Sequence, residues 1–340
     1  MTATLTLVNR RPTIHDVAAA AGVSVATVSK AVNGRYGVAD VTSQRVLQVV
    51  QELGYESSIV ASSMRSRRTG VIGVLVADFE PFSAEILKGV GAALRDSSYD
   101  LLAYSGAHQG ENDGWERKSI SRLSGTLIDG AILVTPTVVT VPAEMPIVAV
   151  DPHTGPADVP TVESDNFAGA LQATNHLIEL GHRRIGFLAG RPDLRSSIRR
   201  QDGYRRALLD AGIRFDPSLI GIGRYQQETA REPAMALLSL RDRPTAIFAA
   251  NDVSAIAIIE VATSMGLSVP DDLSVIGFDD VPEASRMNPP LTTIRQPMQT
   301  IGATAVRLLV SLLDGEQPEE THLRLPTRLV RRATTAPPSA

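Results

Sequence analysis

Residues 13–32 read TIHDVAAAAGVSVATVSKAV, and this stretch decides the fold of the first part of the chain. Apolar residues recur at helical spacing in two short segments that meet at Gly22, namely Ile14, Val17 and Ala18, then Val23, Val28 and Val32. Thr13 and Ser24 stand where helix caps are expected. A glycine turn between two such short helices predicts a helix-turn-helix, whose second helix enters the major groove of DNA.

The charge distribution supports a nucleic-acid-binding head. A third helix is expected at about 42–53, where Val46, Val49, Val50 and Leu53 form an apolar stripe. The net charge of −4 divides unevenly, because residues 1–70 hold eight Lys or Arg against four acids and the remainder holds 25 against 33. A basic head on an acidic body is typical of a DNA-binding module on a larger domain, although charge alone also fits a solvated face.

The sequence from Asp16 to Lys30, DVAAAAGVSVATVSK, with Asn33-Gly34 after it, resembles the LacI/GalR family of bacterial transcription regulators. The resemblance covers nearly the whole chain, through Asp129-Gly130, Asp165-Asn166, Gly181-His182, Gly203-Tyr204, Asn251-Asp252, Gly277-Phe278-Asp279-Asp280 and Pro290-Leu291-Thr292-Thr293-Ile294. It implies that the residues facing DNA are Ser24, Val25, Ala26, Thr27, Ser29, Lys30 and Asn33.

The chemistry of these residues suggests different contacts with DNA. Val25 and Ala26 offer apolar surface suited to a thymine methyl, and Lys30 can reach a guanine edge or a phosphate. We expect Thr27, Ser29 and Asn33 to position the helix on phosphates, but Thr27 could instead cap or pack.

Residues 56–69, ESSIVASSMRSRRT, have the composition of a linker. We therefore place the DNA-binding domain at 1–56 and a hinge at 57–69. The resemblance implies that this hinge forms a short helix on DNA and wedges an apolar side chain into the minor groove. Met64 stands where the family pattern has leucine, and methionine can also act as a wedge. The hinge arginines, which would contact phosphates or keep the linker solvated, are Arg65, Arg67 and Arg68.

Residues 70–340 alternate β-branched runs with helical patterns, which predicts parallel sheets covered by helices on both faces. This alternation of strand and helix patterns occurs twice along the chain. The predicted fold class is therefore an all-α helix-turn-helix head followed by an α/β domain of two doubly wound parallel-sheet lobes. The resemblance makes this domain periplasmic-binding-protein-like, with lobe 1 at about 70–166 and 296–325 and lobe 2 at about 167–295 and 326–340. A Pro/Thr/Ala tail from Ala333 is expected to be disordered.

Ligands of such sheets bind beyond the carboxyl ends of the strands, so an effector is expected in the cleft between the lobes. The resemblance assigns effector contacts to Phe82, Ser83, Ser196, Arg200, Tyr225, Asn251, Asp279 and Met298. Arginine, asparagine and aspartate supply the donors and acceptors that sugar hydroxyls require. A purely structural role is the alternative to ligand contact for three of these residues: Asp279 could cap a helix, Asn251 could brace a turn, and Met298 could belong to the core.

Several classes of protein are disfavoured. Cysteine is absent, which removes disulfides, thiol nucleophiles and thiolate metal sites. No P-loop, G-x-S-x-G elbow or HExxH motif occurs, and the histidines show no ligand spacing, so neither an enzyme nor a metal or other cofactor is expected. No secretory signal or membrane span is recognised, which predicts a cytoplasmic protein without membrane contact.

These features predict a transcriptional regulator, most simply a repressor, that binds a palindromic operator as a homodimer and responds to a small carbohydrate. A purine or nucleoside effector is the alternative within regulation, although Ser83 in place of a stacking aromatic favours a sugar. A solute-binding protein and a sugar-processing enzyme are the alternatives from other classes. The sequence leaves open the effector, the operator, the regulated genes, the sign of the response and any assembly beyond a dimer.

Overall fold

The computed structural model describes residues 12–32, 36–55, 68–106, 114–137, 145–153 and 159–339. The chain divides into two compact units, Met1–Thr69 and Gly70–Ala340, each of which is described by itself. Asn33 and Met64, both predicted DNA contacts, lie outside the described residues. Arg65 and Arg67 of the predicted hinge do so as well.

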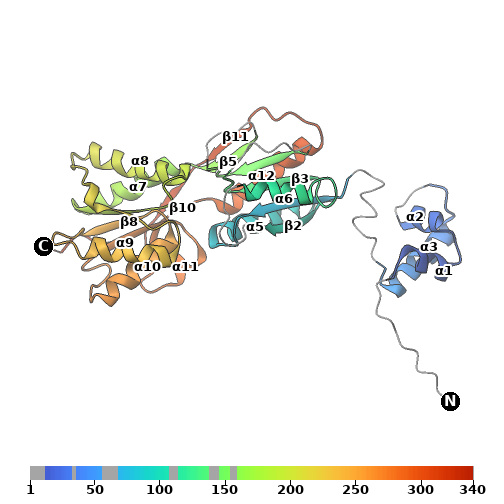
Figure 1. Ribbon diagram of the computed structural model, residues 1–340, viewed down its shortest axis with the longest axis horizontal. Coiled ribbons are helices and arrows are strands. Elements are labelled where there is room, and N and C mark those ends of the chain that lie inside the picture. Colours follow the sequence, from blue (N-terminus) through green and yellow to red (C-terminus); the bar gives the residue numbers. More distant parts are fainter. Residues whose placement is uncertain are drawn as a thin grey trace, which may run out of the picture. The chain divides into compact units, whose positions relative to one another are not determined.

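The described residues of the first unit form three helices, α1 (Ile14–Ala21), α2 (Val25–Val32) and α3 (Asp40–Leu53) (Figure 1). Gly22 ends α1 in the left-handed region, at φ 64°, a conformation that glycine adopts without steric cost. One fully buried valine from each helix, Val17, Val28 and Val46, forms the centre of the small core. The predicted helix-turn-helix is therefore present, and the third helix begins two residues earlier than the apolar stripe indicated.

The second unit contains two six-stranded sheets. The first has the order β11-β5-β4-β3-β1-β2 and the second β12-β10-β9-β8-β6-β7. The strands of the first sheet are β1 (Val71–Val76), β2 (Asp100–Ser105), β3 (Gly130–Val134), β4 (Ile147–Val150), β5 (Thr161–Ser164) and β11 (His322–Leu325). Those of the second are β6 (Ile185–Ala189), β7 (Ile220–Ile222), β8 (Ala246–Ala249), β9 (Ser274–Asp279), β10 (Thr292–Arg295) and β12 (Arg328–Val330).

Each sheet with its helices forms one lobe. The first lobe has α5 (Pro81–Leu94), α6 (Trp115–Leu123) and α12 (Met298–Leu313). The second has α7 (Asn166–Glu179), α8 (Arg195–Asp210), the short 3₁₀ helix η1 (Pro217–Leu219), α9 (Gln227–Leu238), α10 (Asp252–Ser264) and α11 (Pro282–Arg286). All strand pairs are parallel except β10 with β12.

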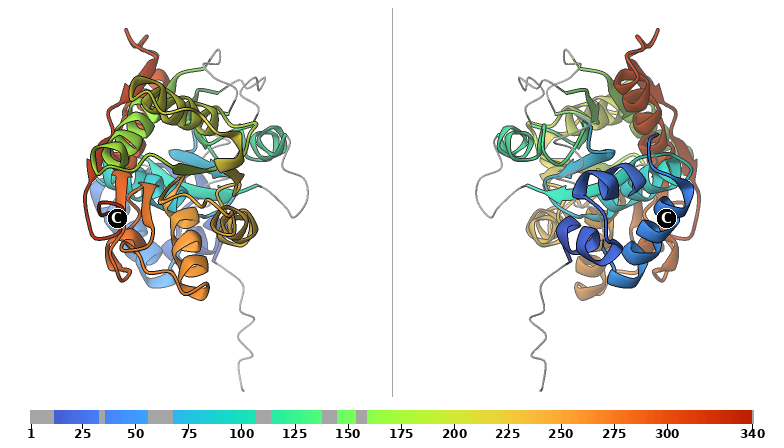
Figure 2. Two further views of the ribbon diagram at one scale, coloured as in Figure 1. Left: turned by 90° about the vertical axis from the view of Figure 1, so that its left-hand side faces the viewer. Right: turned by 90° about the vertical axis from the view of Figure 1, so that its right-hand side faces the viewer.

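Helices cover both faces of each sheet, as the near-continuous apolar strands predicted. In β1, the alternating residues Ile72, Val74 and Val76 join the cluster packed with α5 and α12, whereas Val71 and Leu75 pack with residues of α6. In the second lobe the α7–α8 and α9–α10 pairs lie on opposite sides of the sheet (Figures 1 and 2). The predicted α/β architecture of two doubly wound lobes is confirmed.

The backbones of α5 and α12 touch at two glycines. A Cβ atom on Gly89 would lie 2.0 Å from the carbonyl oxygen of Gln299, and one on Gly302 would lie 2.3 Å from that of Ile86. Side chains at these positions would force the helices apart. Gly89 and Gly302 thus allow α5 and α12 to pack closely.

The prediction of a disordered tail from Ala333 is wrong. Thr334 is completely buried, and its hydroxyl accepts a hydrogen bond from the Thr292 backbone N–H at 2.9 Å while donating to the Val275 carbonyl at 2.6 Å. The Ala336 carbonyl accepts from the Ser274 hydroxyl at 2.9 Å. The tail is ordered because its polar groups pair with backbone groups of β9 and β10, which composition cannot reveal.

Candidate functional site

The helix α2 carries the predicted DNA-binding residues of the described part of the head. Ser24, Ala26 and Lys30 are exposed, whereas Val25, Thr27 and Ser29 are half-buried. Ser24 caps the helix, because its hydroxyl accepts a hydrogen bond from the Thr27 N–H at 3.1 Å and lies 2.9 Å from the Thr27 hydroxyl. Ala26 and Lys30 are one turn apart, so they present one face to solvent.

Arg200 on α8 is the central side chain of the predicted effector site. It is 3% exposed, its Nε donates to Asn166 Oδ1 at 2.8 Å, and its Nη1 donates to the Ala250 carbonyl. The guanidinium lies 3.8 Å from the ring centroid of Phe278 and 5.5 Å from that of Tyr225. Arg200 therefore connects the ends of β8 and β9 with the start of α7.

Asp279 ends β9 beside this arginine, with Oδ1 3.6 Å from Arg200 Nη1. The same oxygen accepts from Gln296 Nε2 at 2.6 Å. Burial raises the pKa of Asp279 to about 6, although the charge of Arg200 opposes the shift. Its φ of 120° is a left-handed value rare outside glycine, and such strain concentrates at functional sites.

Tyr225 and Asn251 are joined by a hydrogen bond near Arg200. A Cβ on Gly190 would lie 2.1 Å from the Tyr225 ring, so the ring occupies the space that this glycine leaves. The Tyr225 hydroxyl lies 3.4 Å from that of Ser196. Asn251 donates to the Tyr225 carbonyl at 3.1 Å and accepts from the Ser254 N–H at 3.0 Å, so its amide braces the turn and caps α10. This is the structural role that the sequence left open for it.

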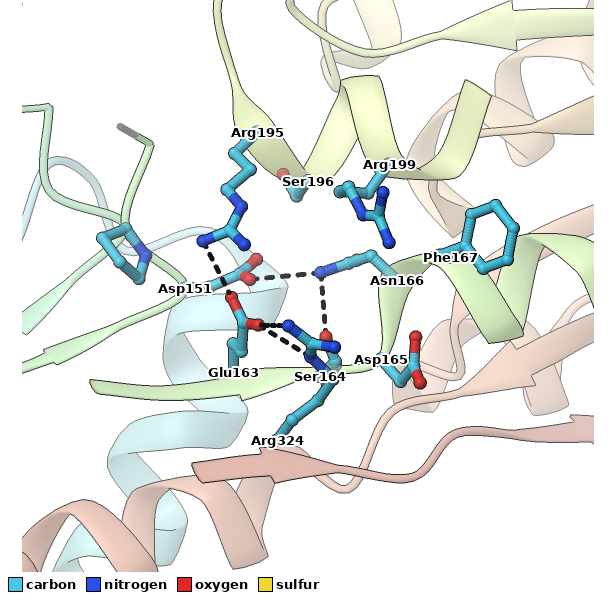
Figure 3. A pocket seen from close by; sticks show the side chains of 11 residues that line it. Asp151, Glu163, Ser164, Asp165, Asn166, Phe167, Arg195, Ser196, Arg199 and Arg324 are labelled. Atoms are coloured by element: carbon cyan, nitrogen blue, oxygen red, sulfur yellow. Dashed lines mark hydrogen bonds and ion pairs between the residues drawn. The ribbon is translucent and has the colours of Figure 1, made fainter. Parts of the chain in front are cut away.

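A small pocket lies between the two lobes, lined by Asp151 and Glu163 of the first and by Arg195 and Arg199 of the second (Figure 3). Asn166 connects them, because its Nδ2 donates to Asp151 Oδ1 of the first lobe at 3.2 Å while its Oδ1 accepts from Arg200 of the second. Burial raises the pKa of Asp151 to about 6, against the opposing charge of Arg200. The hydrogen-bonded series Asp151–Asn166–Arg200, with Asp279 at 3.6 Å, thus spans the cleft.

The edge of the pocket near the interlobe connections carries ion pairs. Glu163 lies 3.7 Å from Arg195 and accepts from Arg324 Nε at 2.8 Å (Figure 3). The Arg195 backbone N–H also donates to the His153 carbonyl at 3.1 Å, which joins α8 of the second lobe to the loop after β4. The pocket lining further includes Ser164, Asp165, Phe167, Ser196 and Arg199.

Contacts among the described residues connect Ser196, Arg200, Tyr225, Asn251 and Asp279. Phe82 and Ser83 lie in the first turn of α5, and Met298 begins α12 and is buried in an apolar cluster that includes residues of both lobes. Among the described residues, no hydrogen bond or ion pair joins these three to Arg200 or Asp279. Their contact with an effector stays a prediction.

Sequence reasoning missed Asn166 and Gln296 as site residues. The Asp165-Asn166 pair was recognised only as part of a family pattern, and Gln296 was not among the predicted residues. Their roles depend on which strand ends meet, a three-dimensional fact for which the sequence carries no local signal. Asp151 was likewise not among the predicted site residues.

Neither a metal centre nor a membrane span is found in the described parts of the chain. No three His, Asp or Glu side chains there are grouped as metal ligands would be. No helix in those parts is long and apolar enough to cross a bilayer.

Two protein-family models match this chain, one in the helix-turn-helix head and one in the two-lobed domain. Residues 13–58 match the model of bacterial regulatory proteins of the lacI family, and residues 174–335 match a periplasmic binding protein-like domain. The HTH-type transcriptional regulator CelR of Thermobifida fusca is 34% identical over 95% of this chain and 98% of its own length. The chain belongs to the LacI family. Members of this family are DNA-binding transcriptional regulators, and this chain is one of them.

Solved LacI-family structures agree with the fold. A CelR–cellobiose complex is 34% identical, with a TM-score of 0.72 over 95% of this chain and all of that one. A lac repressor dimer bound to operator and an anti-inducer is 27% identical, with a TM-score of 0.81 over 96% of this chain and all of that one. The catabolite control protein A of Priestia megaterium is a further relative, 32% identical over 95% of this chain and 99% of its own.

Proposed function

We propose that this LacI-family regulator binds a two-fold symmetric operator as a homodimer, and that a small carbohydrate between its lobes controls operator affinity. The observation that carries the proposal is the series Asp151–Asn166–Arg200, which reaches from one lobe to the other at the carboxyl ends of the strands. Any ligand contacting these groups touches both lobes, so its binding energy depends on how they are closed.

The chemistry of the cleft supports a carbohydrate. A planar guanidinium, two buried carboxylates and the Tyr225 ring together provide paired donors, paired acceptors and an apolar face, which is what vicinal hydroxyls on a sugar ring require. The relatives support the same class, since CelR is known in complex with cellobiose and the lac repressor with operator DNA and an anti-inducer.

The mechanism follows from linkage. A sugar that binds the closed lobes more tightly than the open ones shifts the population toward closure, and the hinge at 57–69 passes this change to the heads. Operator affinity then changes by the coupling free energy, typically ~1–3 kcal/mol. An inducer lowers operator affinity and a corepressor raises it through the same linkage.

On DNA, α2 supplies the base contacts and the dimer supplies the symmetry, because one three-helix head covers only a half-site. Ala26 and Lys30 lie on the exposed face suited to base edges, and Ser24 and Thr27, which cap the helix, lie near phosphates. Met64 would be the apolar wedge at the operator centre. The protein then acts in the cytoplasm, with the chromosome, and has no catalytic role.

The test is selection from random duplex DNA at moderate salt, repeated with a panel of sugars and nucleobases. We expect a palindrome to be enriched and one sugar to change its retention. A requirement for a nucleobase would contradict the carbohydrate assignment, and no enrichment at all would contradict the regulatory function.

Arg200→Ala tests the site itself. The variant should select the same palindrome as the parent chain but lose the response to the sugar. Arg206→Ala is the matched control, because Arg206 is exposed on the same helix and pairs only with Asp210 among the described residues, at 2.9 Å. A response to sugar that survives in Arg200→Ala would show that the effector binds elsewhere.

A further inference from the structure

The first residues of the effector domain are held by hydrogen bonds to two other strands. The Gly70 N–H donates to Asp129 Oδ2 at 2.8 Å, and the Gly70 carbonyl accepts from the Asp100 N–H at 2.7 Å. The Asp129 N–H also donates to the Val71 carbonyl at 2.8 Å. Asp129 therefore binds two consecutive residues, one with its side chain and one with its backbone.

Gly70 has a left-handed backbone conformation, at φ 73°, immediately before β1. A Cβ atom on Gly70 would meet no obstacle, because its nearest neighbour would be the Ser98 carbonyl oxygen at 3.8 Å. Glycine is therefore favoured here by the backbone conformation and not by lack of space. In this conformation the N–H of Gly70 meets the Asp129 carboxylate, so a side chain from another strand fixes the turn into β1.

The backbone that carries Asp129 is itself closely packed. On one side, Ile128 is 1% exposed, and its Cδ1 would lie 2.8 Å from a Cβ atom on Gly73 of β1. On the other side, a Cβ atom on Gly130 would lie 3.0 Å from Leu309 Cδ1 of α12. Close-packed neighbours leave little room for displacement. The Asp129 carboxylate is thus an acceptor on a rigid base.

This group of hydrogen bonds lies at the edge of the first sheet opposite the cleft. The strands β1, β2, β3 and β4 are parallel, so their amino ends share one edge and their carboxyl ends share the other. Asp151 of the cleft directly follows the carboxyl end of β4, whereas Gly70 and Asp129 precede β1 and β3. The fully buried β1 separates the two edges by roughly 20 Å, at about 3.3 Å per residue. A rotation of the first lobe therefore displaces Gly70 together with the cleft wall.

The hinge predicted at residues 57–69 joins the effector domain at Gly70. A hinge whose end is held at one point and in one direction has fewer conformations than a hinge whose last residues move freely. A dimer that binds two half-sites must place its heads at a defined separation. Fixing the end of each hinge reduces the ordering entropy lost on binding, and it narrows the range of separations that the two heads reach.

Building on the operator-binding function proposed above, we propose that Asp129 is a positioning residue for DNA binding. Its carboxylate fixes the point and the direction in which the hinge leaves the effector domain, and in this way it sets the separation of half-sites that the dimer accepts. Asp129 itself touches no DNA in this proposal. It acts through Gly70, whose N–H it holds at 2.8 Å.

The experiment is selection from random duplex DNA with the full chain, under the condition that enriches a palindrome for the parent chain. The parent chain should enrich palindromes with one separation of half-sites. Asp129→Ala should retain the best of these about tenfold less well, equivalent to ~1.4 kcal/mol, because a dimer loses the hydrogen bond twice. Asp129→Ala should also retain palindromes whose half-sites are about one base pair nearer or farther almost equally well.

Two further variants separate positioning from other effects. Asp129→Asn keeps a side-chain oxygen that accepts from the Gly70 N–H, so it should keep the separation that the parent chain selects. Asp100→Ala is the matched control, because it removes an exposed acid at the same edge of the sheet but keeps the backbone N–H that binds Gly70. It should select the same palindromes as the parent chain.

Hydrogen exchange of the free protein gives a second measurement that needs no DNA. The amides of residues 68–71 should exchange at least about tenfold faster in Asp129→Ala than in the parent chain. They should exchange at the parent rate in Asp129→Asn and in Asp100→Ala.

Two results of the selection overturn the proposal. One is an unchanged separation with unchanged retention in Asp129→Ala. The other is a loss of retention in the same ratio at every separation together with a lower melting temperature, because the bond would then only stabilise the lobe. If the parent chain enriches no palindrome, the regulatory function fails, and the exchange rates alone decide the role of Asp129. Equal rates in the parent chain and in Asp129→Ala overturn it.

Discussion

Thr334→Val should destabilise the effector unit, although the residue lies six positions before Ala340. The Thr334 hydroxyl is fully buried between two strands, where it accepts from the Thr292 N–H at 2.9 Å and donates to the Val275 carbonyl at 2.6 Å. Valine has nearly the same shape but neither group. A buried N–H left without a partner costs ~1–3 kcal/mol, and the second hydrogen bond contributes ~0.5–1.5 kcal/mol.

The expected loss is therefore about 2–4 kcal/mol, which lowers the melting temperature of a domain this large by roughly 5–10 °C. Thermal and urea unfolding of the full chain, followed by circular dichroism, measure it. Ser339→Ala is the control, because Ser339 is exposed and its hydroxyl bonds only the Asp271 carbonyl among the described residues. If Thr334→Val melts with the parent chain, the tail does not stabilise the sheet in the way described.

Three further predictions concern packing, capping and pH. Gly89→Ala should cost about 3 kcal/mol or more in unfolding free energy because its Cβ would meet the α12 backbone at 2.0 Å, whereas Gly91→Ala, whose nearest atom is 3.9 Å away, should stabilise α5 by ~0.5–1 kcal/mol. Ser24→Ala should lower the unfolding free energy of the head by ~1 kcal/mol, which thermal melting measures as a change confined to the transition of the head. An unchanged transition would argue against the cap. Burial lowers the pKa of His176 and of His182, so their neutral rings contribute stability above pH 6.5 that is lost as pH falls through the folded pKa. In His182→Gln, the midpoint of denaturation should therefore change less between pH 7.5 and pH 5 than it does in the parent chain.

The fold could be predicted because its signals are local. The glycine turn at Gly22, the cap at Ser24 and the apolar strands of the large unit each act within a few residues of sequence. Short strands without such a pattern were not anticipated. The strands β11 and β12 follow α12 as four- and three-residue segments, and their place is set by the sheet edges that they join.

The site was predictable only in part. The resemblance located Arg200 and Asp279, and the structure places them 3.6 Å apart. It also attributed a ligand contact to Asn251; this stays a prediction, and in the structure the amide bonds the Tyr225 carbonyl and the Ser254 N–H. The position of Asn166 between the lobes depends on where the chain crosses from one sheet to the other, and periodicity does not encode this.

The strands and helices of the first lobe are not contiguous in sequence, and this has a consequence for folding during synthesis on the ribosome. The first sheet receives five strands by Ser164 but lacks β11, and its helix α12 begins only at Met298. At ~5–20 residues per second, the unfinished first lobe waits roughly 10–30 s for these segments, while the second lobe emerges. During that interval the faces of β3 and β4 that α12 will cover are open to other chains. A regulator made in small amounts meets few copies of itself in that time, whereas strong overexpression multiplies such encounters, and misassembled chains should accumulate first under those conditions.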